Sequence, residues 1–179
     1  MTVTRPVELT VHDLAWAEMA AEESVRISSA LGAVLIRIEH IGSTSIPGLL
    51  AKPTIDLMPV VTDLAALDQR AEAVRAIGYD WRGEWGLSGR RYCVRESREG
   101  RRLFHVHCLA SDHPSVESRM AFRDYLRAHA EERRAYELEK LRAARLFPED
   151  TNLYHEAKSA WIEDCERRAV IWARTFPGR

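Results

Sequence analysis

The run of residues from 54 to 61 places the strictest limit on the fold of this chain. It reads Thr-Ile-Asp-Leu-Met-Pro-Val-Val, follows Pro53, and is apolar at every position except its first and third. A short, continuous apolar run of this kind is typical of a strand buried on both faces of a sheet. The carboxylate inside it, Asp56, needs a partner, because a buried charge is costly unless a metal, a cation or amide donors compensate it.

A second expected strand, at residues 33–39, leads directly into a turn-rich segment that contains Gly42 and Ser43. Gly42 lets the backbone approach a ligand closely, and the Ser43 hydroxyl and the amides after it, from Thr44 onward, can donate to phosphate oxygens. A strand, a Gly-Ser turn and a second strand with an inward carboxylate therefore indicate a phosphate site. A plain turn capped by Asp56 explains the same spacing.

Helices and a hairpin account for the rest of the chain. The predicted helices cover residues 12–31, 63–76, 114–129, 131–146 and 151–174. Thr10 and Asp13 form the expected cap of the first helix, and Gly32 ends it. The predicted hairpin strands are 91–95 and 103–109, around a polar turn. The order α-β-β-α-β-β-α-α-α indicates an α+β fold, and we expect one mixed sheet to contain the strands at 33–39, 54–61 and 103–109.

Charge and cysteine content exclude several function classes. The chain has 26 basic and 27 acidic residues, a net charge of −1, so bulk charge does not favour coating of nucleic acid. The three cysteines lack zinc-site spacing and indicate reduced thiols. No signal peptide and no apolar run of about 20 residues is visible. We therefore expect a cytoplasmic protein with no membrane partner.

Histidines on the strand at 103–109 are candidate metal ligands. His105 and His107 share one face of that strand, opposite to the apolar residues between and beside them. Two imidazoles at this spacing can share a metal to which Asp56 supplies an oxygen, whereas hydrogen-bonded strand histidines would give the same pattern. His40, just before the Gly-Ser turn, is a further candidate ligand or phosphate donor.

Lysine is rare in this chain, with 3 lysines against 23 arginines. Lys52 lies between the Gly-Ser turn and Asp56, and Lys158 shares an otherwise apolar helical face with Tyr154. A lysine that points inward needs an anion, and a nucleotide phosphate would serve. A lysine that extends to solvent and pairs with a carboxylate is the alternative.

Residues 82–102 form a basic stretch with seven arginines against three glutamates, a net charge of +4, and aromatic residues between them. Such a stretch can receive a phosphate-bearing acceptor or a single strand of nucleic acid. Charged side chains at a sheet edge more often prevent strand pairing, so nucleic acid is not the expected partner. Arg91, beside the proposed site, is the favoured substrate contact, and Arg123 is a second one.

The segments 40–49 (HIGSTSIPGL) and 51–57 (AKPTIDL) resemble the signature of the GrpB-like (UPF0157) family, which belongs to the nucleotidyltransferase superfamily with the DNA polymerase β-like fold. Weaker matches follow in the family's order at residues 13–16, 105–107, 122–127 and 154–158. The resemblance therefore covers about residues 8–175.

The resemblance implies one domain over residues 1–179, with a mixed sheet of nucleotidyltransferase type, helices packed on it and a helical C-terminal part at about 114–176. It also implies a nucleoside triphosphate, a divalent metal (Mg²⁺ or Mn²⁺, with Zn²⁺ as the alternative) and transfer of a nucleotidyl group to a small-molecule or protein acceptor. Carried across, Gly42 and Ser43 hold phosphate, and Asp56 is the catalytic, metal-binding carboxylate.

This sequence departs from the superfamily at Met58, where a second carboxylate is expected on the same strand face as Asp56. Three function classes therefore stay open: a metal-dependent nucleotidyltransferase, a degenerate nucleotide-binding or interaction domain, and a metal-dependent phosphoester hydrolase built on His105 and His107. A metal site of Asp56 and a histidine would favour an enzyme, whereas Asp56 paired only with Lys52 or amides would favour a binding module.

Overall fold

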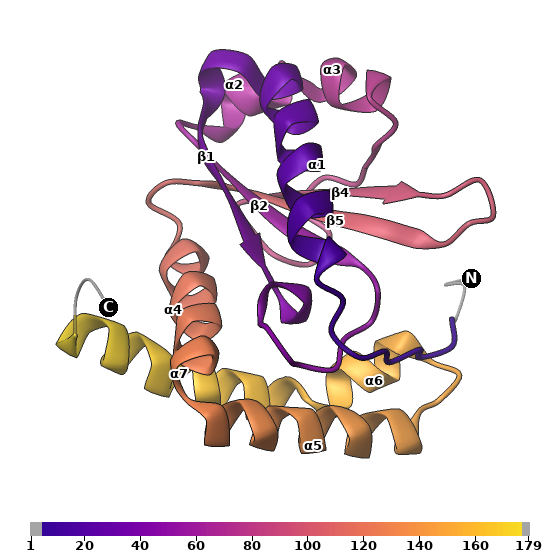
Figure 1. The fold of residues 1–179 in the computed structure, drawn as a ribbon. Helices are drawn as coiled ribbons and strands as arrows, with labels where there is room; N and C mark the ends of the chain where they lie inside the picture. Colours follow the sequence, from indigo (N-terminus) through magenta and orange to yellow (C-terminus); the bar gives the residue numbers. More distant parts are fainter. Residues whose placement is uncertain (1–4, 177–179) are drawn as a thin grey trace.

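A five-stranded mixed sheet forms the centre of the protein, and helices cover both of its faces (Figure 1). The computed structural model describes residues 5–176. The strands are β1 (Leu35–Ile41), β2 (Ile55–Val61), β3 (Asp80–Trp81), β4 (Arg90–Glu96) and β5 (Arg102–Ala110). They lie in the order β1-β2-β5-β4-β3, with β2 and β5 parallel and the other neighbours antiparallel. The predicted α+β class and the neighbouring strands β1, β2 and β5 are therefore confirmed.

The helices form two groups, one on each face of the sheet. They are α1 (Ala15–Leu31), α2 (Leu64–Asp68), α3 (Ala71–Ala76), α4 (Pro114–Ala128), α5 (Ala130–Leu146), α6 (Thr151–Ala157) and α7 (Ser159–Thr175), with two 3₁₀ turns, η1 (Gly32–Val34) and η2 (Ser43–Ser45). Figure 1 shows α5, α6 and α7 beneath the sheet and α4 at its β1 side. Across residues 5–176, no helix combines the length and apolar character that crossing a membrane requires.

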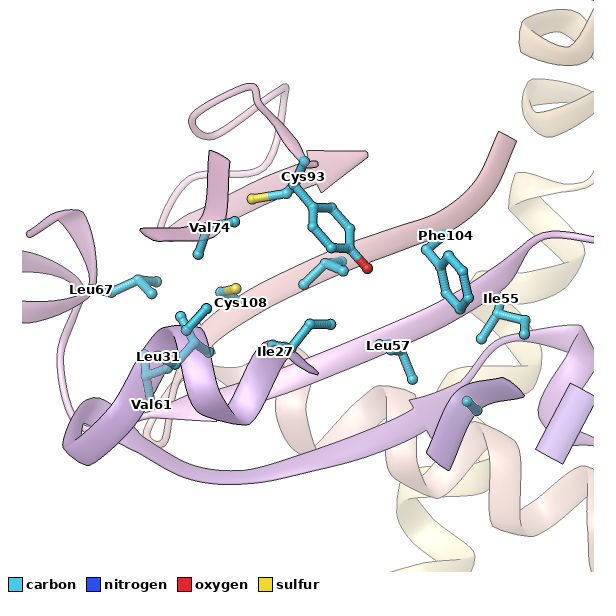
Figure 2. Packing of buried hydrophobic residues seen from close by; sticks show 14 of the residues in the cluster. Ile27, Leu31, Ile55, Leu57, Val61, Leu67, Val74, Cys93, Phe104 and Cys108 are labelled. Atoms are coloured by element: carbon cyan, nitrogen blue, oxygen red, sulfur yellow. The ribbon is translucent and has the colours of Figure 1, made fainter. Parts of the chain in front are cut away.

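Strand β2 is buried from both sides, as its apolar run predicts. Leu57 and Val61 pack with Ile27 and Leu31 of α1 in the larger core (Figure 2). Met58 and Val60 pack on the opposite face, against Val116 of α4 and other apolar residues. Asp56 shares this second face, because side chains alternate along a strand. The helical C-terminal part therefore covers the face that carries Asp56.

The first helix and the first strand both begin later than the sequence predicts. The helix begins at Ala15 with Leu14 at its N-cap position, and Asp13 Oδ1 accepts a hydrogen bond from the Ala15 amide at 2.9 Å. Thr10 takes no part in this helix start and instead forms a β-bridge with Ala51. The strand begins at Leu35 because the three residues before it form the turn η1.

Two predicted helices are each divided in two. The helix expected at 63–76 breaks into α2 and α3, and the guanidinium of Arg70 at this break donates to the Ala30 carbonyl at 2.9 and 2.7 Å. The helix expected at 151–174 breaks at Lys158 into α6 and α7. Local periodicity does not reveal either break, because both halves keep a helical pattern.

Candidate functional site

Asp56 lies at the start of β2, directly against the turn that follows β1. The antiparallel register pairs Ile41 with Asp56, and Gly42 comes next in the chain. Gly42 has φ +70°, and a Cβ atom there would lie 2.4 Å from Asp56 Oδ2. Only glycine fits, both because the backbone is left-handed and because the carboxylate occupies the space. The structure therefore brings the Gly-Ser turn and the carboxylate together.

Strand β5 brings two histidines to the same carboxylate oxygen. His105 Nδ1 and His107 Nε2 each lie 3.3 Å from Asp56 Oδ1. Burial alone would raise the pKa of Asp56, but the hydrogen bonds from the two imidazoles outweigh it and hold this pKa well below its usual value. Asp56 is therefore ionised. Its side chain is 28% exposed, and Oδ2 has no hydrogen-bond donor among residues 5–176, so one oxygen stays free.

Arg90 determines which nitrogen of His107 carries the proton. Nη1 of this buried arginine lies 3.2 Å from His107 Nδ1. A guanidinium only donates, so Nδ1 is the acceptor and the ring proton is on Nε2, facing Asp56. Burial, the largest effect, lowers the pKa of His107 to about 4 although Asp56 acts to raise it. The ring is thus a neutral hydrogen-bond donor to the carboxylate.

Asp56, His105 and His107 are also the one group within residues 5–176 whose side chains could hold a metal, with one ligand atom from each within 4.8 Å of the others. Two nitrogens and one oxygen suit Zn²⁺ or Mn²⁺ better than Mg²⁺, which prefers oxygen ligands. His105 is the less constrained of the two histidines, because its Nε2 has no hydrogen-bond partner among the described residues and so nothing fixes its tautomer.

His107 does not fit the role of a metal ligand. A metal on Nε2 would place the ring proton on Nδ1, where it would face the Arg90 guanidinium, another donor. Metal-binding histidines normally donate their second ring N–H to an acceptor. The residues present therefore suit a metal held by Asp56 and His105, with His107 as a hydrogen-bond donor beside it.

We expect Arg90→Gln to convert His107 into a metal ligand. The glutamine oxygen can accept a hydrogen bond from Nδ1–H, which leaves the Nε2 lone pair free. Zn²⁺ affinity, measured by competition with a chromophoric chelator, should rise about tenfold or more over the wild type. Arg90→Lys is the matched control, because an ammonium still donates to Nδ1. Equal Zn²⁺ affinity in the two variants would contradict the tautomer assignment.

All three lysines of the chain gather around two tyrosines of the helical part. The Nζ atoms of Lys52 and Lys158 lie 5.8 and 5.1 Å from the ring centre of Tyr154, and Lys140 Nζ lies 4.9 Å from that of Tyr136. Each ammonium is held close to aromatic rings, and none forms an ion pair with a carboxylate in the part of the chain that the structure describes.

Within residues 5–176 the lysines lack a carboxylate partner, although Lys52 donates to His155 and Lys140 donates to the Leu50 carbonyl. Burial is the largest effect and lowers the pKa of Lys52 and of Lys158 to about 8, while Asp56 acts to raise both. Lys158 lowers the pKa of Lys52 further. Burial, and after it Lys158, lower the pKa of Lys140 to about 7. Arg119 of α4 has no hydrogen-bond or ion-pair partner between residues 5 and 176; burial lowers its pKa, and Asp56 acts to raise it. Cations therefore outnumber carboxylates around Asp56, and this arrangement can hold an anion.

Most of the residues singled out from the sequence lie in this region. They are Gly42, Ser43, Lys52, Asp56, His105, His107, Tyr154 and Lys158. Ser43 hydrogen-bonds Tyr136, whose pKa burial raises to about 12. Tyr154 is buried, and its ring lies near both Lys52 and Lys158.

Four other sequence candidates are engaged elsewhere. The hydroxyl of Thr44 is 2.9 Å from His40 Nε2, so these two side chains satisfy each other. Arg123 of α4 donates to Glu39 at 2.9 Å and to the His40 carbonyl at 3.1 Å, which fastens α4 to β1. Arg91 lies on the opposite face of β4 from Tyr92, where it forms two hydrogen bonds to Asp68 at 2.6 and 2.8 Å. Arg91 therefore does not reach Asp56.

Sequence reasoning missed several members of the site, which are Arg90, Tyr92, Arg119, Lys140 and His155. His155 Nε2 accepts a hydrogen bond from Lys52 at 3.1 Å, and burial lowers its pKa to about 2. Alternation along β4 would have separated Arg90 and Tyr92 from Arg91, and the rarity of lysine would have drawn attention to Lys140.

A mixed sheet whose first strand, Gly-Ser turn and carboxylate-bearing second strand meet in this way defines a protein of the nucleotidyltransferase fold. The structure of Cid1 in complex with its short product ApU is similar in fold, with a TM-score of 0.52 and 14% identity over 76% of this chain and 43% of that chain. Within this class the chain belongs to the GrpB family, whose profile, "GrpB protein", matches residues 6–168. The predicted family is confirmed.

Relatives support the same assignment. The crystal structure of conserved protein GrpB from Enterococcus faecalis has a TM-score of 0.85 and 34% identity, and the match covers 91% of this chain and 97% of that chain. UPF0157 protein YqkA of Bacillus subtilis is 38% identical over 95% of this chain and 49% of its own length. A dephospho-CoA kinase of Mycolicibacterium paratuberculosis is 29% identical over 94% of this chain and 47% of its own. The chain thus spans about half the length of both of these curated relatives.

Proposed function

We propose that the protein binds a nucleoside triphosphate through its phosphates and transfers the nucleotidyl group to a hydroxyl of an acceptor. The observation that carries this proposal is the pair Lys52 and Lys158. The Lys158 side chain is buried and that of Lys52 is half-buried, and Asp56 acts on the pKa of both. Neither ammonium has a carboxylate partner among the described residues, although Lys52 donates to the neutral His155. An anionic ligand would compensate them, and a phosphate is the anion that an adjacent Gly-Ser turn best accommodates.

Asp56 suits the role of a permanently charged ligand rather than that of a base. Its low pKa makes it a weak proton acceptor at neutral pH, since efficient general bases have a pKa near the working pH. His105 and His107 fix Oδ1 and so orient Oδ2 toward the Gly42 turn. A divalent metal bound by Asp56 and His105 would supply neutralisation of phosphate charge.

Met58 favours a second candidate, a domain that binds nucleotide without transferring it. The side chain is fully buried in an apolar cluster, so no second carboxylate stands beside Asp56 on β2. The contact of Arg90 with His107 speaks against the third class, a hydrolase built on two metal-bound histidines. The two remaining candidates share the phosphate site and differ only in chemistry at Asp56.

Inorganic tripolyphosphate and adenosine triphosphate should stabilise the protein against heat, with Mg²⁺, Mn²⁺ or Zn²⁺ tested separately. At a hundredfold excess over the dissociation constant, the free energy of unfolding should rise by about 2.7 kcal/mol. Lys52→Ala and Lys158→Ala should each weaken binding about tenfold or more, because each removes a charge-assisted contact. Arg167→Ala, which removes an exposed cation of α7, is the control and should bind as the wild type does.

The pH dependence of this binding has a defined sign. The pKa of each of the two lysines is about 8, so both ammoniums lose their protons as pH rises through this value. Affinity for tripolyphosphate should therefore fall by more than about tenfold between about pH 7.5 and pH 9.5. Lys52→Arg, which stays charged, should show a smaller fall. The proposal fails if neither triphosphate ligand shifts the melting temperature at millimolar concentration.

A further inference from the structure

Trp85 lies in the turn before β4, and both its exposure and its backbone conformation are unfavourable in free energy. The side chain is 58% exposed, although it is large and apolar. Its backbone has φ +44°, and within residues 5–176 it is the one non-glycine residue with positive φ. Left-handed backbone is strained for a bulky residue, and such strain persists where the surrounding structure imposes it, often at ligand sites.

The turn that holds Trp85 is fixed by the arginine that orients His107. Arg90 Nη2 donates to the Trp85 carbonyl at 2.5 Å, and Arg90 Nε donates to the Glu84 carbonyl at 3.2 Å. The Glu84 carboxylate in turn accepts a hydrogen bond from the Gly89 amide at 2.8 Å. One buried guanidinium therefore contacts both the backbone of Trp85 and the ring of His107.

A row of rings leads from Trp85 to Asp56 across the sheet. Trp85 and Tyr92 are stacked, with ring centres 6.4 Å apart and planes inclined by 29°. Tyr92 contacts the rings of His105 at 5.6 Å and His107 at 5.2 Å, and both histidines bind Asp56. The row reaches the carboxylate from the β4 side, whereas Lys52 lies three residues before the start of β2.

We propose that Trp85 is a stacking platform for the nucleobase of a nucleoside bound beside the Asp56 site. The ring is planar and 58% exposed, which suits stacking of a planar heteroaromatic ring. Arg82, whose guanidinium lies 5.0 Å from the Trp85 ring, is already ion-paired with Asp80, so the platform itself offers little net charge. A part for the bound nucleoside in transfer rests on the proposed function, but the stacking itself does not.

Tryptophan fluorescence tests the platform directly. Adenosine and uridine, which carry no phosphate, are titrated into the wild type, Trp85→Ala, Trp85→Phe and Trp172→Phe, and the dissociation constants are checked by calorimetry. We expect at least one nucleoside to quench the wild type, and Trp85→Ala to weaken its binding about tenfold or more. Trp85→Phe should retain part of the affinity. Trp172, which packs against Tyr125 and His129 of the helical part, is the matched control and should leave binding unchanged.

Tripolyphosphate separates this proposal from the proposed function. Trp85→Ala should bind tripolyphosphate as the wild type does, because that ligand has no ring. Equal nucleoside affinity in the wild type and Trp85→Ala overturns the platform, and so does the absence of nucleoside binding to the wild type at millimolar concentration. If the wild type does not bind tripolyphosphate, the proposed phosphate site is refuted. The proposal for Trp85 is then still decided by the nucleoside titration.

Discussion

Replacement of Gly42 by alanine is expected to lower the free energy of unfolding by about 3 kcal/mol. Two effects add at this position. The backbone has φ +70° and ψ −175°, a conformation that only glycine adopts readily. The new Cβ would also lie 2.4 Å from Asp56 Oδ2, so the carboxylate or the turn must move. Denaturant unfolding measures the loss, and affinity for tripolyphosphate should fall with it.

Gly48 provides the matched control for this variant. It has φ +77°, but a Cβ there would meet nothing within 4 Å. Gly48→Ala should therefore cost only the backbone strain, about 1 kcal/mol. A double-mutant cycle isolates the second effect, since Gly42→Ala should cost less in an Asp56→Ala background. Equal costs in both backgrounds would show that the carboxylate does not require glycine at this position.

Asp56→Asn is expected to reduce nucleotidyl transfer, followed as pyrophosphate release from a nucleoside triphosphate with Mn²⁺, by about a thousandfold. Asparagine keeps an oxygen that can accept from His105 and His107, but it loses the charge that a metal requires. Asp112→Asn, an exposed carboxylate outside the site, is the control. Undiminished transfer by Asp56→Asn would remove Asp56 from the reaction.

Asp56→Asn should also change how the free energy of unfolding depends on pH. The pKa of Asp56 is held below its ordinary value, so the carboxylate stabilises the fold above about pH 4, where it is ionised in the unfolded chain too. This contribution is lost as pH falls through the lowered pKa. Asp56→Asn should therefore be about 2 kcal/mol less stable at neutral pH, and the difference should shrink in acid. A large loss of stability with unchanged metal affinity would instead assign Asp56 a structural role.

Local patterns account for the parts of the fold that the sequence predicts well. The apolar run of β2 needs burial on both faces, and this requirement already places it inside the sheet with Asp56 aimed at one side. Alternation on β5 likewise places His105 and His107 together. The ends of the elements are predicted less accurately. The turn η1 and the breaks at Arg70 and Lys158 depend on tertiary contacts, or on turns that keep the helical period of the sequence.

The faces of β4 show the limit of this reasoning. Side chains alternate with a period of two, so Arg90 and Arg91 point to opposite sides, and composition does not say which side holds the site. The structure settles the choice, because Arg90 reaches His107 whereas Arg91 binds Asp68. Arg119 and Lys140 come from helices that approach Asp56 and its neighbours only after folding. No sequence motif near residue 56 therefore predicts that they belong to the site.

The concentration of every lysine in one place has a chemical consequence. The 23 arginines do not react with acylating reagents under mild conditions, so the side-chain amines of this protein are those of Lys52, Lys140 and Lys158. With their lowered pKa values, these amines are partly unprotonated and hence nucleophilic near pH 8. Acylation of these side chains, measured separately from that of the α-amino group, would therefore report on a single region of the molecule, and a ligand that covers the ammoniums would protect it.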